Sequence, residues 1–362
     1  MTRITPQPGI MDIALYQGGR SHLAGVEHVL KLSSNENPLG PPPSAVKALG
    51  EAAGAMHLYP STDHAALRAA IGEVWEVEPA RVICGVGSDE VLQFVTQAFA
   101  GPGDEIIYTR HGFSMYPILT SMAGATRVCV PETDRVVDVD AILSAVTKRT
   151  RVVLLANPAN PTGTMLPEAE LERLADALPP FVILVIDAAY AEFAQGYDGG
   201  IALAGTRPNV LVTRTFSKIY GLGGLRVGWG YGPQEMIDVM TRIRQPFNLS
   251  VVQLAAAEAA VRDRAWLEQC AMLNVEQRAR LTGAVRQLGL ACDDSHANFV
   301  LARASDAAEA DAVEAALNAA GILIRRVAGY GFPEGLRITV GDAQQTGRVI
   351  DALTKWREGV AA

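Results

Sequence analysis

Short apolar runs alternate with amphipathic stretches along the first 250 residues. Runs rich in Val, Ile and Leu predict strands at 81–85, 104–109, 126–132, 151–158, 181–190 and 209–218. Continuous apolar runs of this kind are typical of strands that are buried on both faces of a mainly parallel sheet. The spacing of apolar positions predicts helices at 44–56 and 62–75, the second with Thr62 or Asp63 as its N-cap, and another helix after the glycine turn that follows residue 85.

The pattern changes after about residue 250. A long helical stretch at 251–289, with room for one break, precedes strands at 298–304, 322–327 and 336–341 and helices at 306–321 and 342–359. Residues 1–45 are rich in Pro, Gly and Asn and predict an extended arm. We therefore expect an α/β protein with an N-terminal arm (1–45), a large domain (46–250) with a mainly parallel sheet flanked by helices, and a smaller C-terminal α/β domain (251–362).

The composition is that of a globular protein, with 49% hydrophobic and 19% charged residues in a chain of 362. The net charge of −8 argues against general nucleic-acid binding, which usually needs a basic surface. Four scattered cysteines without a CxxC pair predict reduced thiols, and the six histidines lack the spacing of metal ligands, so no metal site is expected. No apolar signal core or run of 18 apolar residues occurs, which predicts a cytoplasmic protein that does not enter a membrane.

Polar side chains stand at the ends of three predicted strands. Asn157 lies at the end of the strand at 151–158 and Asn160 just beyond it, Asp187 lies near the end of the next, and Ser217 and Lys218 end the third. In open α/β sheets a ligand binds outside the carboxyl ends of the strands. The sequence therefore predicts a binding site at this edge of the sheet.

Three of the polar strings have two interpretations each. GVGSDE places the amides of Gly87, Ser88 and Asp89 at a helix start, where an anion is favoured, although a capping box formed by Ser88 would account for the same residues. NPANPTG is either an ordinary turn or an irregular one that presents the amide of Asn160 to a ring hydroxyl, and two Asn-Pro pairs favour the second. Asp187 is either a helix N-cap or a carboxylate that keeps a ring nitrogen protonated.

The string TFSKIYGLGGLR, residues 215–226, surrounds a lysine with hydroxyls, glycines and an arginine. A Walker loop is excluded, because GxxxxGK[ST] is absent and the lysine precedes the glycines. Lys218 is either a solvated surface lysine or a Schiff-base former, and in the second case Thr215, Ser217 and Arg226 form an anion clamp beside it. Tyr190, three residues after the carboxylate, can donate a hydrogen bond on the same side.

The order of these groups along the chain points to one cofactor. Pyridoxal phosphate carries a phosphate, a phenolic oxygen, a ring nitrogen and an aldehyde. These groups require, in turn, backbone amides with an arginine, an asparagine with a tyrosine, a carboxylate and a lysine. The chain supplies all of them at successive predicted strand ends.

The chain resembles the fold-type I aminotransferases, which depend on pyridoxal phosphate, over nearly its whole length. The likeness is carried by GVGSDE (85–90), NPANPTG (157–163), DAAY (187–190), TFSK (215–218) and GLGGLR (221–226). KLSSNENPLG (31–40), FSMY (113–116) and LRITVG (336–341) are similar to the histidinol-phosphate branch of that family. Two positions depart from the family pattern, since Ala188 replaces a glutamate and Val86 an asparagine.

The resemblance implies a role for each residue of the cofactor site. Lys218 is expected to form the bond to the cofactor aldehyde, and Asp187 to pair with the pyridinium nitrogen. Asn160 and Tyr190 are expected at the phenolic oxygen, and Phe113, where many relatives have tyrosine, is expected to stack on the ring. The residues expected around the phosphate are Ser88, Asp89, Thr215, Ser217 and Arg226.

Substrate binding and assembly follow from the same resemblance. Arg337 is expected to bind a substrate carboxylate or phosphate with help from Arg325, although surface salt bridges would also account for both arginines. Tyr16 is expected to close over the substrate. Tyr59 is expected to reach the phosphate from a neighbouring subunit, which implies a homodimer with a shared site.

The implied reaction moves the amino group of histidinol phosphate to 2-oxoglutarate and gives imidazole-acetol phosphate and glutamate, a step of histidine biosynthesis. An aromatic amino-acid aminotransferase and a threonine-phosphate decarboxylase would need the same cofactor site, and both remain open alternatives. A non-enzymatic binding module is disfavoured, because every expected catalytic group is present.

Overall fold

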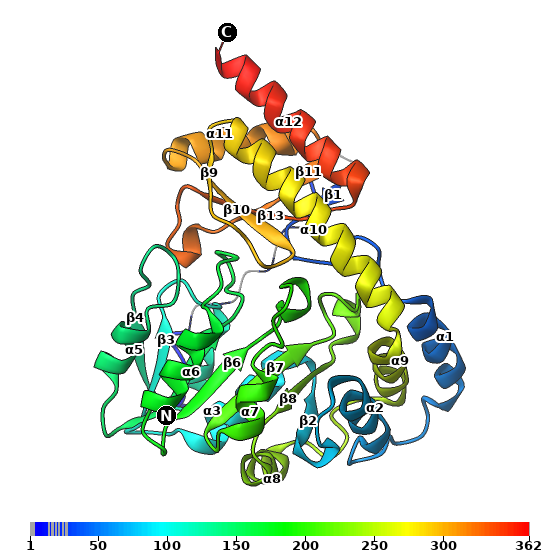
Figure 1. The fold of residues 1–362 in the computed structure, drawn as a ribbon, viewed down its shortest axis with the longest axis vertical. Coiled ribbons are helices and arrows are strands. Elements are labelled where there is room, and N and C mark those ends of the chain that lie inside the picture. Colours follow the sequence, from blue (N-terminus) through cyan, green and yellow to red (C-terminus); the bar gives the residue numbers. More distant parts are fainter. Residues whose placement is uncertain are drawn as a thin grey trace.

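The computed structural model describes residues 4–13, 15, 18, 20, 22, 23, 25 and 28–361. The described chain forms a broad body around a seven-stranded sheet and a smaller body above it (Figure 1). The strands of the large sheet, in spatial order, are β2 (Val82–Gly85), β8 (Gly228–Tyr231), β7 (Val210–Thr215), β6 (Ile183–Asp187), β5 (Thr150–Ala156), β3 (Glu105–Thr109) and β4 (Thr126–Val130). The six apolar runs of the first 250 residues are therefore all strands, as predicted.

The large sheet is mainly parallel, as predicted, with one strand that the sequence pattern missed. β7, β6, β5, β3 and β4 pair in parallel, whereas β8 runs antiparallel to both β2 and β7. The sequence of β8 is GWGY, in which two glycines interrupt the apolar side chains. Such a strand has no apolar run by which to recognise it.

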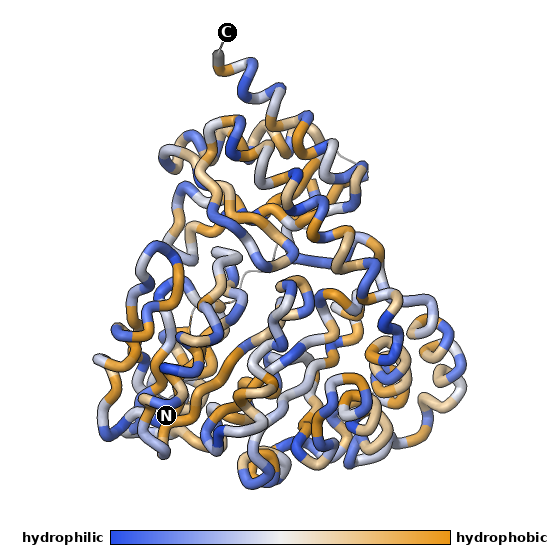
Figure 2. The backbone as a smooth tube through the Cα atoms, in the orientation of Figure 1, coloured by the Kyte–Doolittle hydropathy of each residue, from blue (hydrophilic) through white to orange (hydrophobic). Residues whose placement is uncertain are grey.

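Consecutive residues of the central strands enter two different cores, one on each face of the sheet. In β5, Val153 and Leu155 belong to the core on one face, whereas Val152 and Leu154 belong to the core on the other. Because side chains alternate along a strand, a strand that is covered on both faces needs apolar residues at every position. The central strand β6, with the sequence ILVID, accordingly shows as mainly hydrophobic in Figure 2.

Helices cover both faces of the large sheet. The face of Val152 and Leu154 carries α3 (Gly87–Phe99), α4 (Met115–Met122) and α8 (Gln234–Ile243). The face of Val153 and Leu155 carries α1 (Pro43–Ala52), α2 (Ala65–Trp75), α5 (Val139–Ala145), α6 (Glu168–Ala177), α7 (Ile201–Thr206) and α9 (Val251–Arg262). The predicted N-cap of α2 is wrong: the cap is His64 with φ of 53°, although Asp63 Oδ1 still accepts a hydrogen bond from the backbone N–H of Ala65 at 3.1 Å.

The smaller body is built on an antiparallel sheet. Its strands, in spatial order, are β12 (Arg325–Arg326), β13 (Gly335–Thr339), β10 (Phe299–Arg303) and β9 (Ala291–Cys292), and its helices are α10 (Arg264–Gln287), α11 (Ala307–Ala319) and α12 (Ala343–Ala361). A separate parallel pair joins β1 (Leu30–Lys31) to β11 (Ile322–Leu323). The N-terminal segment is thereby attached to the smaller body before it continues into the larger one.

The long helical stretch after residue 250 connects the two bodies. It breaks once, at Asp263, whose carboxylate accepts a hydrogen bond from the backbone N–H of Trp266 and so begins α10. α9 packs against α1 and α2, and α10 then supplies Cys270 to the larger core and Leu281 to the smaller one. The domain boundaries at residues 45 and 250 stay predictions. Among the described residues, no helix is long and apolar enough to span a membrane.

Candidate active site

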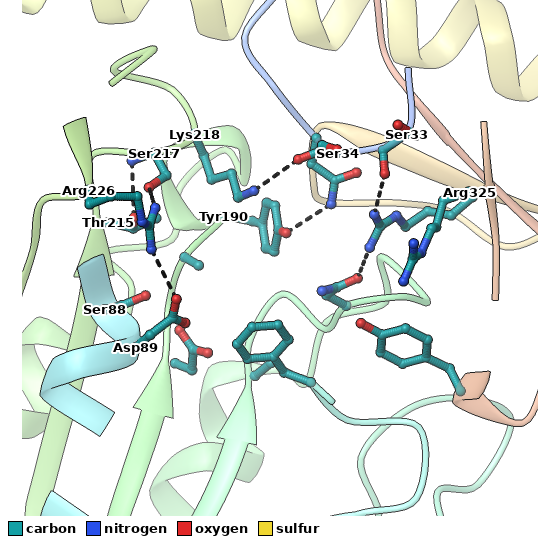
Figure 3. A pocket seen from close by; sticks show the side chains of 18 residues that line it. Ser33, Ser34, Ser88, Asp89, Tyr190, Thr215, Ser217, Lys218, Arg226 and Arg325 are labelled. Atoms are coloured by element: carbon teal, nitrogen blue, oxygen red, sulfur yellow. Dashed lines mark hydrogen bonds and ion pairs between the residues drawn. The ribbon is translucent and has the colours of Figure 1, made fainter. Parts of the chain in front are cut away.

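A cavity of about 200 Å³ lies between the carboxyl edge of the large sheet and the smaller body (Figure 3). It brings together the ends of β5, β6 and β7, the start of α3, the segment that follows β1, and two strands of the smaller body. The residues that line it are Ser33, Ser34, Asn35, Ser88, Asp89, Phe113, Ala156, Asn160, Asp187, Ala189, Tyr190, Thr215, Ser217, Lys218, Arg226, Arg325, Tyr330 and Arg337. All but two of the predicted site residues are in this set.

Lys218 lies three residues beyond β7, and its amine points into the cavity. Nζ donates a hydrogen bond to the backbone carbonyl of Ser34 at 3.2 Å and lies 5.6 Å from the centre of the Tyr190 ring (Figure 3). Burial, together with the nearby positive charge of Arg337, lowers the pKa of Lys218 to about 8. The side chain is therefore not the solvated surface lysine of the alternative interpretation.

Asp187 is the last residue of β6 and is only 5% exposed. Tyr116 Oη and Thr213 Oγ1 donate hydrogen bonds to its carboxylate at 3.0 and 3.1 Å. Burial raises the pKa of Asp187 to about 6, against the opposing effect of these two hydrogen bonds. No α-helix begins within the next ten residues, so the interpretation of Asp187 as the N-cap of an α-helix is wrong.

The side of the cavity next to Lys218 gathers the groups that were predicted to hold an anion. Arg226 Nη1 donates to Ser217 Oγ at 2.9 Å, and Nη2 donates to Asp89 Oδ2 at 3.0 Å (Figure 3). Gly87, with φ of 79°, begins α3 beside this guanidinium, and a Cβ there would lie 2.5 Å from Arg226 Nη2. The N-cap of α3 is Val86, which has no side-chain cap, so the capping-box interpretation of Ser88 is wrong.

Two arginines of the smaller body face the cavity from β12 and β13. Arg337 Nη1 donates to Asn160 Oδ1 at 2.5 Å, and Nη2 donates to the backbone carbonyl of Ser33 at 3.0 Å. Arg325 Nη1 donates to the backbone carbonyl of Gly18 at 2.6 Å. Both arginines therefore bind the N-terminal segment and line the cavity, rather than lying on the outer surface of the strands.

The remaining predicted residues differ in their relation to the cavity: two line it, one does not, and one lies outside the described residues. Phe113 lines the cavity and meets Tyr116 edge to face with ring centres 5.8 Å apart, and Thr215 Oγ1 accepts a hydrogen bond from the backbone N–H of Ser217 at 3.1 Å. Tyr59 does not line the cavity; it is 82% exposed and packs on Phe247 with ring centres 4.5 Å apart. Tyr16 lies outside the described residues.

Sequence reasoning missed several lining or supporting side chains. Ser33, Ser34 and Asn35 belong to the string KLSSNENPLG, and Tyr116 belongs to FSMY, but the strings alone do not single these residues out. Tyr330 lies in no predicted element, yet it reaches Ser114, with the two hydroxyl oxygens 3.1 Å apart. Which residues of a string face the cavity depends on the fold.

The fold and the cavity match those expected for a fold-type I aminotransferase. The chain belongs to the family of class I and II aminotransferases, whose family model matches residues 27–353. It is 63% identical over 361 residues to the histidinol-phosphate aminotransferase of Ruegeria pomeroyi, with all of both chains covered. It is 61% identical to the histidinol-phosphate aminotransferase of Roseobacter denitrificans, covering 98% of this chain and 99% of that one. The crystal structure of histidinol-phosphate aminotransferase from Sinorhizobium meliloti in complex with pyridoxal-5'-phosphate is similar with a TM-score of 0.90, 28% identity and 99% of both chains covered.

Proposed function

We propose that the chain uses pyridoxal 5'-phosphate to transfer the amino group of histidinol phosphate to 2-oxoglutarate, giving imidazole-acetol phosphate and glutamate. The observation that carries this proposal is that Lys218, Asp187 and Arg226 line one cavity. The choice of substrate is supported by identities of 55–63% to relatives named histidinol-phosphate aminotransferase. The reaction then belongs to histidine biosynthesis, and we expect it in the cytoplasm.

The side chains of the cavity fit pyridoxal phosphate. Backbone N–H groups at the start of α3, together with Ser88 and Arg226, are suited to the phosphate. Asp187, a buried carboxylate whose side-chain hydrogen bonds come from two neutral hydroxyl groups, is suited to the protonated ring nitrogen. Asn160 and Tyr190 are suited to the phenolic oxygen. When bound, the cofactor supplies an electron sink for the bond that breaks at the amino carbon of the substrate.

Lys218 has two tasks in this proposal: it holds the cofactor through the aldehyde carbon, and it moves a proton. A pKa near 8 leaves about half of its amine neutral at that pH, and the neutral amine is both the nucleophile and the base. After the substrate amine has displaced it, Nζ takes the proton from the amino carbon of the substrate. The backbone carbonyl of Ser34, which accepts from Nζ at 3.2 Å, keeps the amine near this position.

Arg337 and Arg325 are proposed to form the anion subsite for both substrates. A guanidinium binds a carboxylate and a phosphate with similar geometry, so one subsite serves the phosphate of the amino donor and a carboxylate of 2-oxoglutarate in turn. The hydrogen bond from Arg337 to Asn160 supports this placement, because it holds the guanidinium beside the proposed cofactor position. Tyr16 is proposed to close over the same subsite.

We also propose a homodimer in which Tyr59 reaches the phosphate of the neighbouring site. Tyr59 is 82% exposed, and Met56, Leu58 and Phe247 are exposed apolar residues near it in the sequence or in the fold. An exposed apolar group of this kind is typical of an interface. Light scattering of the purified protein should give twice the chain mass of 38.5 kDa, and a mass of one chain would reject the shared site.

The substrate is tested by steady-state rates with 2-oxoglutarate and one of four donors: histidinol phosphate, phenylalanine, tyrosine or threonine phosphate. The proposal requires the highest kcat/KM with histidinol phosphate. A preference for phenylalanine or tyrosine would identify an aromatic aminotransferase instead. Release of CO₂ from threonine phosphate without 2-oxoglutarate would identify the decarboxylase. Cofactor use is tested separately, because an apoprotein that shows no absorption change with pyridoxal phosphate would contradict the proposal at its first step.

A further inference from the structure

Asn35 occupies a strained and fully enclosed position beside the cavity. It is 1% exposed and has φ of 57°, a left-handed conformation that asparagine tolerates better than most residues. Its backbone carbonyl accepts a hydrogen bond from Asn298 Nδ2 at 3.0 Å, and its backbone N–H donates to Thr339 Oγ1 at 3.0 Å. Residues of the smaller body thus hold the backbone of Asn35 on both sides.

The orientation of the Asn35 amide follows from Thr339. The hydroxyl proton of Thr339 is donated to Asn35 Oδ1 at 3.2 Å, and no other acceptor for that proton occurs among the described residues. Thr339 is buried, so a reversed amide would leave its hydroxyl proton without a partner. Oδ1 therefore faces Thr339, and the Nδ2 amide group faces the opposite way.

The Nδ2 group of Asn35 donates a hydrogen bond to Tyr190 Oη at 2.9 Å (Figure 3). The phenolic oxygen of Tyr190 thus acts as an acceptor on this side. Burial raises the pKa of the Tyr190 phenol, so the hydroxyl keeps its proton. Within the part of the chain that the structure describes, no acceptor receives this proton, and Tyr190 lines the cavity.

We propose that Asn35 is a positioning residue that holds the Tyr190 hydroxyl as a hydrogen-bond donor directed into the cavity. The proposal rests on the proposed function, because the acceptor in the cavity would be the phenolic oxygen of pyridoxal phosphate. An unrestrained tyrosine hydroxyl can rotate and direct its proton elsewhere. Because Asn35 Nδ2 already donates to one side of Tyr190 Oη, the hydroxyl proton of Tyr190 points to the other side, into the cavity.

The consequence for the bound cofactor is a shift in its titration. A donor at the phenolic oxygen withdraws negative charge from it, and the nearby cationic nitrogen of the bond to lysine then loses its proton at a lower pH. Loss of the donor should raise the pH midpoint of the visible absorption change of the cofactor-loaded protein. One hydrogen bond to a charged group corresponds to a shift of about one pH unit.

The test is a double-mutant cycle read from this pH midpoint, without substrates or turnover. Asn35→Gly removes the amide, and glycine adopts the φ of 57° without strain. We expect Asn35→Gly and Tyr190→Phe each to raise the midpoint by about one pH unit, and the double variant to match Tyr190→Phe alone. Asn298→Ala removes a hydrogen bond to the backbone carbonyl of Asn35 but keeps the Asn35 amide and its bonds to Thr339 and Tyr190, so it is the matched control and should leave the midpoint unchanged.

Three outcomes would overturn the proposal: no shift in Asn35→Gly, the same further shift when Tyr190→Phe is already present, or an equal shift in Asn298→Ala. If Asn35→Gly does not fold, Asn35→Asp preserves the shape and the acceptor for Thr339 but cannot donate to Tyr190, and it should also raise the midpoint. Failure of the proposed function looks different, because the wild-type protein would then cause no absorption change when pyridoxal phosphate is added.

Discussion

The buried carboxylate of Asp187 should destabilise the cofactor-free protein, and its removal should reveal this cost. The pKa of Asp187 rises from 3.8 in the unfolded chain to about 6 in the folded one. A raised folded-state pKa stabilises the fold only while the group is protonated. That contribution is complete below pH 3.8 and is lost as the pH rises through about 6. At pH 8 the ionised Asp187 therefore costs about 3 kcal/mol relative to an unperturbed carboxylate, and at pH 5 about 1.6 kcal/mol.

Asp187→Asn removes this charge and keeps the shape of the side chain. The amide NH₂ cannot accept a hydrogen bond, so one of the two donors, Tyr116 or Thr213, loses its acceptor. This loss lowers the unfolding free energy by about 1–2 kcal/mol at any pH. The unfolding free energy of the variant minus that of wild type should therefore increase by about 1.4 kcal/mol from pH 5 to pH 8. With pyridoxal phosphate present the order should reverse, because only the wild-type carboxylate can pair with the protonated ring nitrogen.

The assay is urea unfolding of cofactor-free wild-type and Asp187→Asn protein at pH 5 and pH 8, repeated at pH 8 with the cofactor. Asp238→Asn, which removes an exposed carboxylate from α8, is the matched control and should show no such dependence. If the difference between wild type and Asp187→Asn is the same at both pH values, the carboxylate is not desolvated as the structure indicates. The reasoning from burial to pKa would then be refuted.

Three further predictions concern the other groups of the cavity. Lys218→Ala should lower kcat by a factor of about 10³ or more while circular dichroism shows an unchanged fold, and a near-normal rate would remove the lysine from the mechanism. Arg337→Leu should raise KM for both substrates by about tenfold or more, whereas Arg303→Leu, outside the cavity on β10, should not; equal effects of the two would contradict an anion subsite. The rate at which the apoprotein binds pyridoxal phosphate should rise with pH around a midpoint near 8, set by the lowered pKa of Lys218, and a midpoint near the ordinary value of 10.5 would argue against burial of the amine.

The parts of the fold that the sequence predicted are those with a strong local signal. The strands β5, β6 and β7 were recognisable because burial on both faces favours runs of consecutive apolar residues, here 152–156, 183–186 and 210–212. Asn160, Asp187 and Lys218 were recognisable because the carboxyl ends of such strands form the edge at which open α/β sheets bind ligands. β8 was not predicted, because its two glycines interrupt the apolar pattern. The predicted N-cap of α2 was wrong, because a residue in the left-handed conformation, His64, precedes the helix instead.

The supporting contacts could not be predicted, because they join segments that are remote in the sequence. Tyr116 reaches Asp187 across 71 positions, and Asn35 reaches Thr339 across 304. Each of these residues is ordinary in its local string, and its partner is determined by the placement of helices and by the smaller body. A lone polar residue in an arm without periodicity carries no sign of what it will contact.

Helix α10 couples the stability of the two bodies, because it packs into both of their cores. It runs without a break for 24 residues, about 36 Å, and buries Cys270 in one core and Leu281 in the other. If either body melted alone, half of this helix would lose its apolar cover while the other half remained packed. Heat or denaturant should therefore unfold both bodies in one cooperative transition, and the cavity between them should persist until that transition begins.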